Sequence, residues 1–356
     1  MQESKNTVLL ENRMDNSVWR FRVIMTIYLL AVVLAQMLYG QQPVKRILAQ
    51  DSTLNNLADP PGYRSVKLGT LGGVLKVGKG SQPMILIPGL GFSANVFTDF
   101  MAGLSDMCRM YAVTLPGFGG TAAPPSPGEK TSLGEQTWTN GALQAIEKLI
   151  KDEGIEKPII VGHWLTGTQL ALRLAMKHPD KIKAVIILAG SARMTATDSA
   201  RAAMINTLEK RVAVNDKYMA PRWFKTVTRE TWDDNNFLPG DYAINPVRAL
   251  RLWREAASPE LHVWVRYLCE FNSQDISLEM EKITVPILMV QPDLSGIYHD
   301  PGNNYMESFI NASWGETFRK NPKIRVVTIP DARVCLWFDQ PEKVKKTVEE
   351  FLKRSE

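Results

Sequence analysis

The fold is decided by the stretch Pro158-Ile159-Ile160-Val161-Gly162-His163-Trp164-Leu165-Thr166-Gly167. Its apolar run between Pro158 and Gly162 predicts a short strand that is buried on both faces. Residues 169–176 then repeat apolar side chains at helical spacing and predict a helix. The stretch therefore predicts a buried strand, a tight turn and a helix in direct succession.

Trp164 lies at the centre of this turn. Small residues two positions before it and two after it, Gly162 and Thr166, are typical of a nucleophile elbow, a strained turn that lifts one side chain over the sheet edge. A nucleophile needs a lone pair that can attack a carbonyl, and an indole offers only an N–H donor. The sequence predicts an elbow whose reactive group is missing.

Other short apolar runs predict the rest of a sheet. Including the run at 159–161 described above, there are six: residues 84–87, 110–114, 159–161, 184–188, 287–290 and 324–329. Amphipathic helical stretches lie between many of them, which is typical of a parallel sheet covered by helices. Ahead of these runs, residues 66–77 alternate around Gly72-Gly73 and predict a β-hairpin. The predicted fold class is α/β, with a mostly parallel central sheet and helices on both faces.

The alternation of strands and helices stops between residues 191 and 282. Helical patterns around residues 201–214 and 246–271 predict a helical cap inserted before the strand at 287–290. Four tryptophans in this part either pack the cap on the core or line an apolar pocket. They are Trp223, Trp232, Trp253 and Trp264.

The predicted domain organisation has five parts. They are a signal peptide or signal anchor at 1–40, a linker at 41–65, the first part of the core at 66–190, the cap at 191–282 and the second part of the core at 283–356.

The N-terminus carries a targeting signal. Arg20 and Arg22 precede an apolar run at residues 23–38, and a small residue and a polar stretch follow it. A run of this length fits a secretory signal peptide better than a full membrane span, with cleavage expected after Gly40. An uncleaved signal anchor is the alternative. In either case we expect the folded part to be exported, either periplasmic or secreted, with membrane contact only through this segment if it stays uncleaved.

Composition and motifs exclude several partners. The 42 basic and 37 acidic residues are spread along the chain without a basic block, so we expect no nucleic-acid binding. Cys108, Cys269 and Cys335 lack metal-site spacing and are expected to be buried and inert. No motif predicts a metal or a cofactor.

From about residue 66 to 356 the chain resembles the α/β-hydrolase superfamily. Four local features, in family order, carry the resemblance: an oxyanion-type loop at Pro88-Gly89-Leu90-Gly91-Phe92-Ser93, a Pro-Gly-Phe-Gly turn at residues 116–119, the elbow, and the segment 329–341, which normally presents the catalytic histidine. The resemblance implies the α/β-hydrolase fold with a cap, and chemistry that needs no cofactor.

The resemblance also implies where a Ser-acid-His triad would lie. The nucleophile position falls on Trp164 and the base position on Val334, and neither side chain can transfer a proton. Asp293 is the first candidate for the vestigial acid and Asp300 the second, while a loop-capping role for Asp293 stays open. The expected triad is therefore degenerate.

Further positions around the implied pocket use backbone or polar groups. The backbone N–H groups of Leu90 and Leu165 would form the oxyanion hole. We expect His163 to be a structural neighbour of the elbow residue, while His299 follows the acid strand and could approach the site. The pocket candidates are Gly89, Ser93, His163 and His299.

Three functions are compatible with these features. The first is a pseudoenzyme that binds a small apolar ligand or a partner without turnover. The second is a disabled variant of a hydrolase for esters or similar small apolar substrates, whose active form has serine at position 164 and histidine at position 334. The third is a non-hydrolytic enzyme that uses His299 and Asp293 as acid and base.

Overall fold

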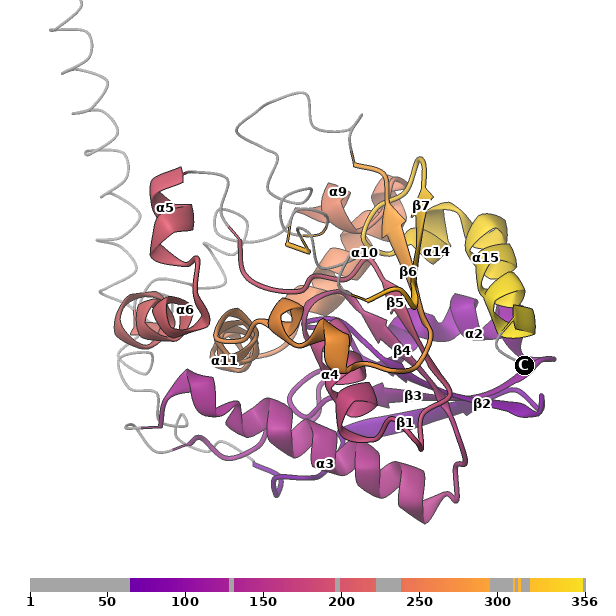
Figure 1. Cartoon of the computed structure of the whole chain (residues 1–356), viewed down its shortest axis with the longest axis horizontal. Helices are drawn as coiled ribbons and strands as arrows, with labels where there is room; N and C mark the ends of the chain where they lie inside the picture. The colour runs from indigo at the N-terminus through magenta and orange to yellow at the C-terminus, as the bar shows by residue number, and fades with distance from the viewer. Residues whose placement is uncertain are drawn as a thin grey trace, which may run out of the picture. The chain divides into compact units, whose positions relative to one another are not determined.

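The computed structural model describes residues 65–127, 131–195, 199–221, 238–294, 310, 313–314 and 321–354. These residues form a seven-stranded sheet in the order β1-β3-β2-β4-β5-β6-β7 (Figure 1). The strands are β1 Gly73–Val77, β2 Gln82–Ile87, β3 Cys108–Thr114, β4 Ile159–His163, β5 Ala184–Leu188, β6 Ile287–Pro292 and β7 Ile324–Ile329. All neighbours pair in parallel except β1 and β3.

The six predicted apolar strands are confirmed, but the predicted hairpin is wrong. Only residues 73–77 form a strand, and this strand pairs antiparallel with β3, with Gly73 opposite Thr114. The residues before it lie instead beside Ala123, since the Val66 N–H donates to the Ala123 carbonyl at 2.8 Å. Residues 73–77 therefore pair with the distant strand β3, and not with the residues just before the Gly-Gly pair.

Helices cover both faces of the sheet, as the sequence predicts. Helices α2 and α15 pack together on one side, whereas α3 and α4 lie on the other (Figure 1). The helices outside the cap are η2 Ala94–Phe97, α2 Thr98–Leu104, η3 Leu133–Glu135, α3 Thr137–Asp152, α4 Trp164–Lys177, α14 Leu336–Asp339 and α15 Pro341–Arg354.

Helices between β5 and β6 form the cap insertion. They are α5 Ser199–Met204, α6 Leu208–Val214, η4 Asn215–Met219, α9 Pro239–Tyr242, α10 Pro246–Ala257, α11 Leu261–Asn272, η5 Ile276–Leu278 and η6 Met280–Lys282. The predicted helical stretch at 246–271 is divided near Pro259, because proline cannot donate a helical hydrogen bond. Trp264 is buried and Trp253 half-buried, whereas Trp223 and Trp232 lie outside the described residues.

A buried carboxylate joins the cap to the core. Glu270 on α11 accepts the backbone N–H groups of Trp138 at 2.9 Å and Thr139 at 2.8 Å, in the first turn of α3. Orphan N–H groups and the helix dipole both favour a negative charge at this end of a helix. Burial nevertheless raises the pKa of Glu270. This contact fixes α11 on the core helix α3.

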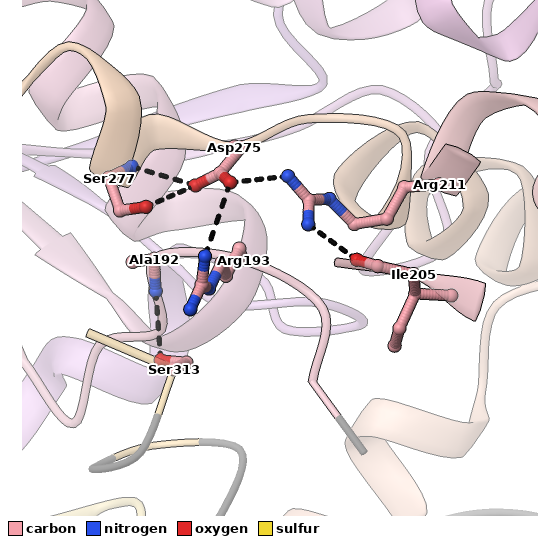
Figure 2. Close-up of polar contacts among 7 residues, drawn as sticks. All are labelled: Ala192, Arg193, Ile205, Arg211, Asp275, Ser277 and Ser313. Atoms are coloured by element: carbon pink, nitrogen blue, oxygen red, sulfur yellow. Dashed lines mark hydrogen bonds and ion pairs between the residues drawn. The ribbon is translucent and has the colours of Figure 1, made fainter. Parts of the chain in front are cut away.

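A second buried charge ties together the two ends of the cap insertion (Figure 2). Asp275, just before η5, accepts hydrogen bonds from Arg211 on α6 and from the Ser277 N–H at 3.1 Å. Arg193, which follows β5, lies with its guanidinium 3.6 Å from the same carboxylate. The cluster therefore connects the chain entering the cap, a cap helix and the chain leaving the cap.

All three cysteines are free and buried, as predicted. Burial raises the pKa of the Cys108 thiol to about 11 and that of Cys335 well above its ordinary value. A thiol with a raised pKa holds little thiolate at neutral pH and is a poor nucleophile.

Candidate functional site

Trp164 is the first residue of α4 and adopts a left-handed backbone conformation, with φ of +48°. This conformation is strained for a bulky side chain and marks a sharp turn between β4 and α4. A Cβ added to Gly162 would lie 2.5 Å from the Gly167 carbonyl oxygen, so only glycine fits two positions before the turn. The backbone here makes the strained strand-to-helix turn that the sequence predicted, with an indole at the predicted nucleophile position.

Gly167 is a further requirement of the turn that the sequence interpretation overlooked. A Cβ at this position would lie 2.4 Å from the Ile87 carbonyl oxygen, so the start of α4 packs directly on the end of β2. Thr166, the small residue named from the sequence, is fully buried beside it. Gly167, three positions after Trp164, was the feature of the sequence that could have predicted this close packing.

Aromatic rings bury the indole of Trp164 completely. The Tyr242 ring lies edge-on to it at a centroid distance of 5.7 Å, and the Phe92 ring lies at 6.5 Å. Tyr242 and Phe92 also contact each other, at 5.5 Å. Phe92 comes from the loop after β2 and Tyr242 from the cap helix α9. Side chains from core and cap therefore fill the space above the elbow.

Tyr242 is a site residue for which the sequence offers no signal. Its hydroxyl is buried and has no hydrogen-bond partner among the described residues. Burial raises its pKa well above the ordinary value. An unpaired buried hydroxyl costs about 1–3 kcal/mol, and such groups in native structures call for an explanation.

His163 connects the two loops on either side of the elbow. Its Nδ1 accepts the Gly89 N–H at 3.3 Å, and its Nε2 lies 3.2 Å from the Val334 carbonyl oxygen, to which it can donate. The two bonds together require a neutral imidazole with the proton on Nε2. Burial lowers its pKa to about 3. With both nitrogens engaged by backbone, His163 acts as a structural residue.

We expect His163 to make the protein less stable in acid. Its pKa falls from 6.5 to about 3 on folding. Between these values the unfolded chain holds a proton that the folded chain does not. This group should therefore lower the free energy of unfolding by up to about 1.4 kcal/mol per pH unit as the pH falls through that window. Urea unfolding across the window measures the slope. His163→Gln keeps a donor and an acceptor but does not titrate, and an equal slope in this variant would contradict the expectation.

The loop that carries Val334, the predicted base position, is hydrogen-bonded to the cap. Val334 is fully buried, and its N–H donates to the Asp241 carbonyl at 3.1 Å. The Cys335 N–H donates to the Tyr242 carbonyl at 3.0 Å. The loop that would present a catalytic histidine thus pairs with α9. Cys335 offers no replacement nucleophile, because it is buried and its pKa is raised.

The acid candidates are only partly described. Asp293 directly follows β6 and is half-buried, and its N–H donates to the Ile329 carbonyl at 2.9 Å, which extends the pairing with β7. Asp300 and His299 lie outside the described residues.

Ser93 is occupied by structural contacts. Its hydroxyl donates to the Glu255 carboxylate of α10 at 2.7 Å and accepts the Asn95 N–H at 3.3 Å. A serine nucleophile is ordinarily activated by an imidazole, whereas the acceptor of the Ser93 hydroxyl is a carboxylate. The contact instead ties the loop after β2 to the cap.

The two residues predicted to form an oxyanion hole lie in loops or helix starts that follow β2 and β4. Leu90 lies in the loop after β2 and Leu165 in the first turn of α4, and both are fully buried. First-turn N–H groups have no partner within their helix. The N–H of Gly89, in contrast, is committed to His163. No group of three His, Cys, Asp or Glu side chains in the described ranges could hold a metal ion.

The mostly parallel sheet, the strained turn after β4 and the cap between β5 and β6 define an α/β-hydrolase fold. Residues 84–347 match the sequence model of the alpha/beta hydrolase family, and the chain belongs to this family. The resemblance drawn from the motifs is thus confirmed.

Curated relatives include esterases. The pimeloyl-[acyl-carrier protein] methyl ester esterase of Yersinia enterocolitica is 20% identical over 282 residues, which cover 78% of this chain and 96% of the relative. The esterase of the same name from Vibrio cholerae is 25% identical over 220 residues, covering 61% and 77%.

Solved structures show the same fold. A bromoperoxidase from Bacillus anthracis superposes with a TM-score of 0.57 at 16% identity, covering 79% of this chain and 94% of that one. The enol-lactonase from Burkholderia xenovorans LB400 gives 0.53 at 21% identity, covering 79% and 96%. At these identities the likeness concerns the fold alone.

Proposed function

We propose that this chain is an alpha/beta hydrolase family member without serine-hydrolase activity, a pseudoenzyme. The observation that carries the proposal is the buried indole of Trp164 in the left-handed elbow position. Val334 at the base position supports it, because an isopropyl group cannot accept a proton. Phe92 and Tyr242 fill the volume that a substrate carbonyl would need.

The size of the catalytic loss supports this proposal. Removing the nucleophile or the base of a triad lowers turnover by about 10⁴ to 10⁶, and the losses do not add because the groups act as one unit. Oxyanion donors at Leu90 and Leu165 would stabilise negative charge but cannot start the attack. Ester hydrolysis should therefore fall to the background rate.

The unsubstituted chain is expected to stay unlabelled by a fluorophosphonate probe and to leave a p-nitrophenyl ester at the buffer rate. In-gel fluorescence and absorbance at the nitrophenolate band measure the two outcomes. Heat-denatured protein is the control for nonspecific labelling. Labelling of the native chain alone would show that another hydroxyl has taken over the reaction and would end the proposal.

A disabled ester hydrolase is the second candidate function. It is favoured by the curated esterase relatives together with the backbone of the elbow, since Gly162 and Gly167 still meet its steric demands. In this case the active form has serine at position 164 and histidine at position 334, and acts on an ester of small apolar type. The paired substitution that tests it is treated in the Discussion.

Ligand binding without turnover would require movement of the cap. Trp164 and Tyr242 are both completely buried, and α9 is bonded to the loop at Val334. A small apolar ligand at the elbow would have to displace the Tyr242 ring. We therefore propose that any such ligand binds together with an opening of α9.

We also propose that the chain is exported. The support is the arginine-flanked apolar run at residues 23–38, which lies outside the described residues. None of the helices in the described part of the chain is long and apolar enough to cross a membrane. Intact-mass measurement of protein from a secreting host should show loss of residues 1–40. A full-length mass in the membrane fraction would support the uncleaved anchor instead.

A further inference from the structure

Helix α10 presents two different faces. Three residues on its inner side are buried against the rest of the protein: Ala249, Leu252 and Ala256. Residues on the opposite side are exposed: Val247, Leu250, Arg251 and Arg254. Positions i, i+3, i+4 and i+7 share one side of a helix, so the exposed residues form a continuous stripe. Its first half is apolar and its second half is basic.

Large apolar side chains are exposed mainly on the cap. Eight of the ten such side chains in the described ranges belong to it: Met204, Leu208, Tyr218, Leu238, Ile244, Val247, Leu250 and Leu278. Val247 is 78% exposed, Leu238 54% and Ile244 48%. Isolated exposed apolar residues are ordinary, whereas a cluster marks an interaction site. Four of these side chains, Leu238, Ile244, Val247 and Leu250, fall within 13 residues of sequence, from the start of α9 to the first turns of α10.

Three arginines border this apolar cluster. Arg248 stacks its guanidinium over the Phe338 ring at 4.7 Å and makes an exposed pair with Asp99 at 3.8 Å. Arg251 and Arg254 form no ion pair with any described residue. We call Leu238, Ile244, Val247, Leu250 and the three arginines the α10 surface.

Two carboxylates near these arginines, Glu255 and Asp339, accept hydrogen bonds from other residues. Glu255 accepts the hydroxyl and the N–H of Ser93. Asp339 accepts the backbone N–H groups of Ile244 and Arg333, both at 2.9 Å. These acids serve the attachment of the cap, and the two charged residues of the exposed stripe itself, Arg251 and Arg254, are both positive.

We propose that the α10 surface docks on an anionic phospholipid bilayer. Exposed aliphatic side chains next to arginines match the boundary between acyl chains and negatively charged headgroups. The apolar run at residues 23–38 would hold the chain near such a bilayer if it stays uncleaved.

A fluorescent label on the full chain tests this docking at one position. The three native cysteines are buried, so a cysteine introduced by Val247→Cys is the reactive one and can carry an environment-sensitive NBD group. Val326→Cys on β7, which is 42% exposed, is the matched control. Both proteins are mixed with phosphatidylcholine vesicles that contain or lack phosphatidylglycerol. Because both carry the same N-terminal segment, a difference between them reports on the α10 surface.

We expect the emission at position 247 to rise and shift to shorter wavelength with the anionic vesicles, and the emission at position 326 to stay unchanged. Adding Arg251→Gln and Arg254→Gln should weaken this response about 30-fold, which corresponds to about 1 kcal/mol for each arginine near the membrane. Lys148→Gln with Lys151→Gln on α3 is the matched charge control and should have no effect.

Three results would overturn the proposal. The first is no response at position 247, which would leave a protein partner as the occupant. The second is an equal response with neutral vesicles, and the third is an equal response at both labelled positions. Circular dichroism of each variant checks that these surface changes leave the fold intact.

Discussion

The double variant Trp164→Ser, Val334→His should hydrolyse a short p-nitrophenyl ester at least about 100-fold faster than the unsubstituted chain, a partial recovery of the 10⁴ to 10⁶ that a lost triad costs. The elbow already holds position 164 in the required backbone conformation. The loop at 334 already lies within hydrogen-bond distance of His163, the neighbour of that position. Replacing the indole by a hydroxymethyl group also frees space for a substrate carbonyl.

The single variants are the controls for this rescue. Trp164→Ser lacks a base and Val334→His lacks a nucleophile, so both should remain near background. Fluorophosphonate labelling of the double variant alone would identify the new serine as the reactive group. Adding Asp293→Asn should then reduce the gain if Asp293 orients the histidine. A folded double variant without any gain would count against both the disabled-hydrolase function and the assignment of position 334.

Trp164→Ala should lower the free energy of unfolding by about 3 kcal/mol or more. The side chain is completely buried and contacts Phe92 and Tyr242. Large-to-small changes of buried tryptophan typically cost about 3–5 kcal/mol, through lost transfer energy and an unfilled cavity. Urea denaturation followed by circular dichroism measures the change, because the loss of an indole alters the fluorescence signal.

Trp164→Gly separates backbone strain from packing. Alanine keeps a Cβ at φ of +48°, whereas glycine adopts this conformation without strain. We therefore expect the glycine variant to be more stable than the alanine variant by about 1 kcal/mol, the reverse of their usual order in helices. Trp253→Ala, at a half-buried cap position, should cost less than either. A loss below about 1 kcal/mol at Trp164 would show that the aromatic contacts are not tightly packed.

The strands and the elbow were accessible from the sequence because both depend on local pattern. Short apolar runs favour burial on two faces, which holds for β2 to β6, whereas the edge strand β7 is only partly buried. A Cβ at position 162 would lie too close to the Gly167 carbonyl oxygen, so the turn requires glycine there, and Gly162 marked it. The prediction of a hairpin at residues 66–77 was wrong because a Gly-Gly pair permits a tight turn but does not determine which strand pairs with which.

By itself, the sequence determined the fold class and the strand-turn-helix segment that carries Trp164, since these follow from residue type and spacing. Only the tertiary structure decided what surrounds Trp164: the Tyr242 ring from the cap, and the bonds of His163 to Gly89 and Val334, the latter 171 positions away. Such contacts depend on how the cap packs over the sheet edge. No local periodicity encodes that packing, because it is settled only when distant segments are buried together.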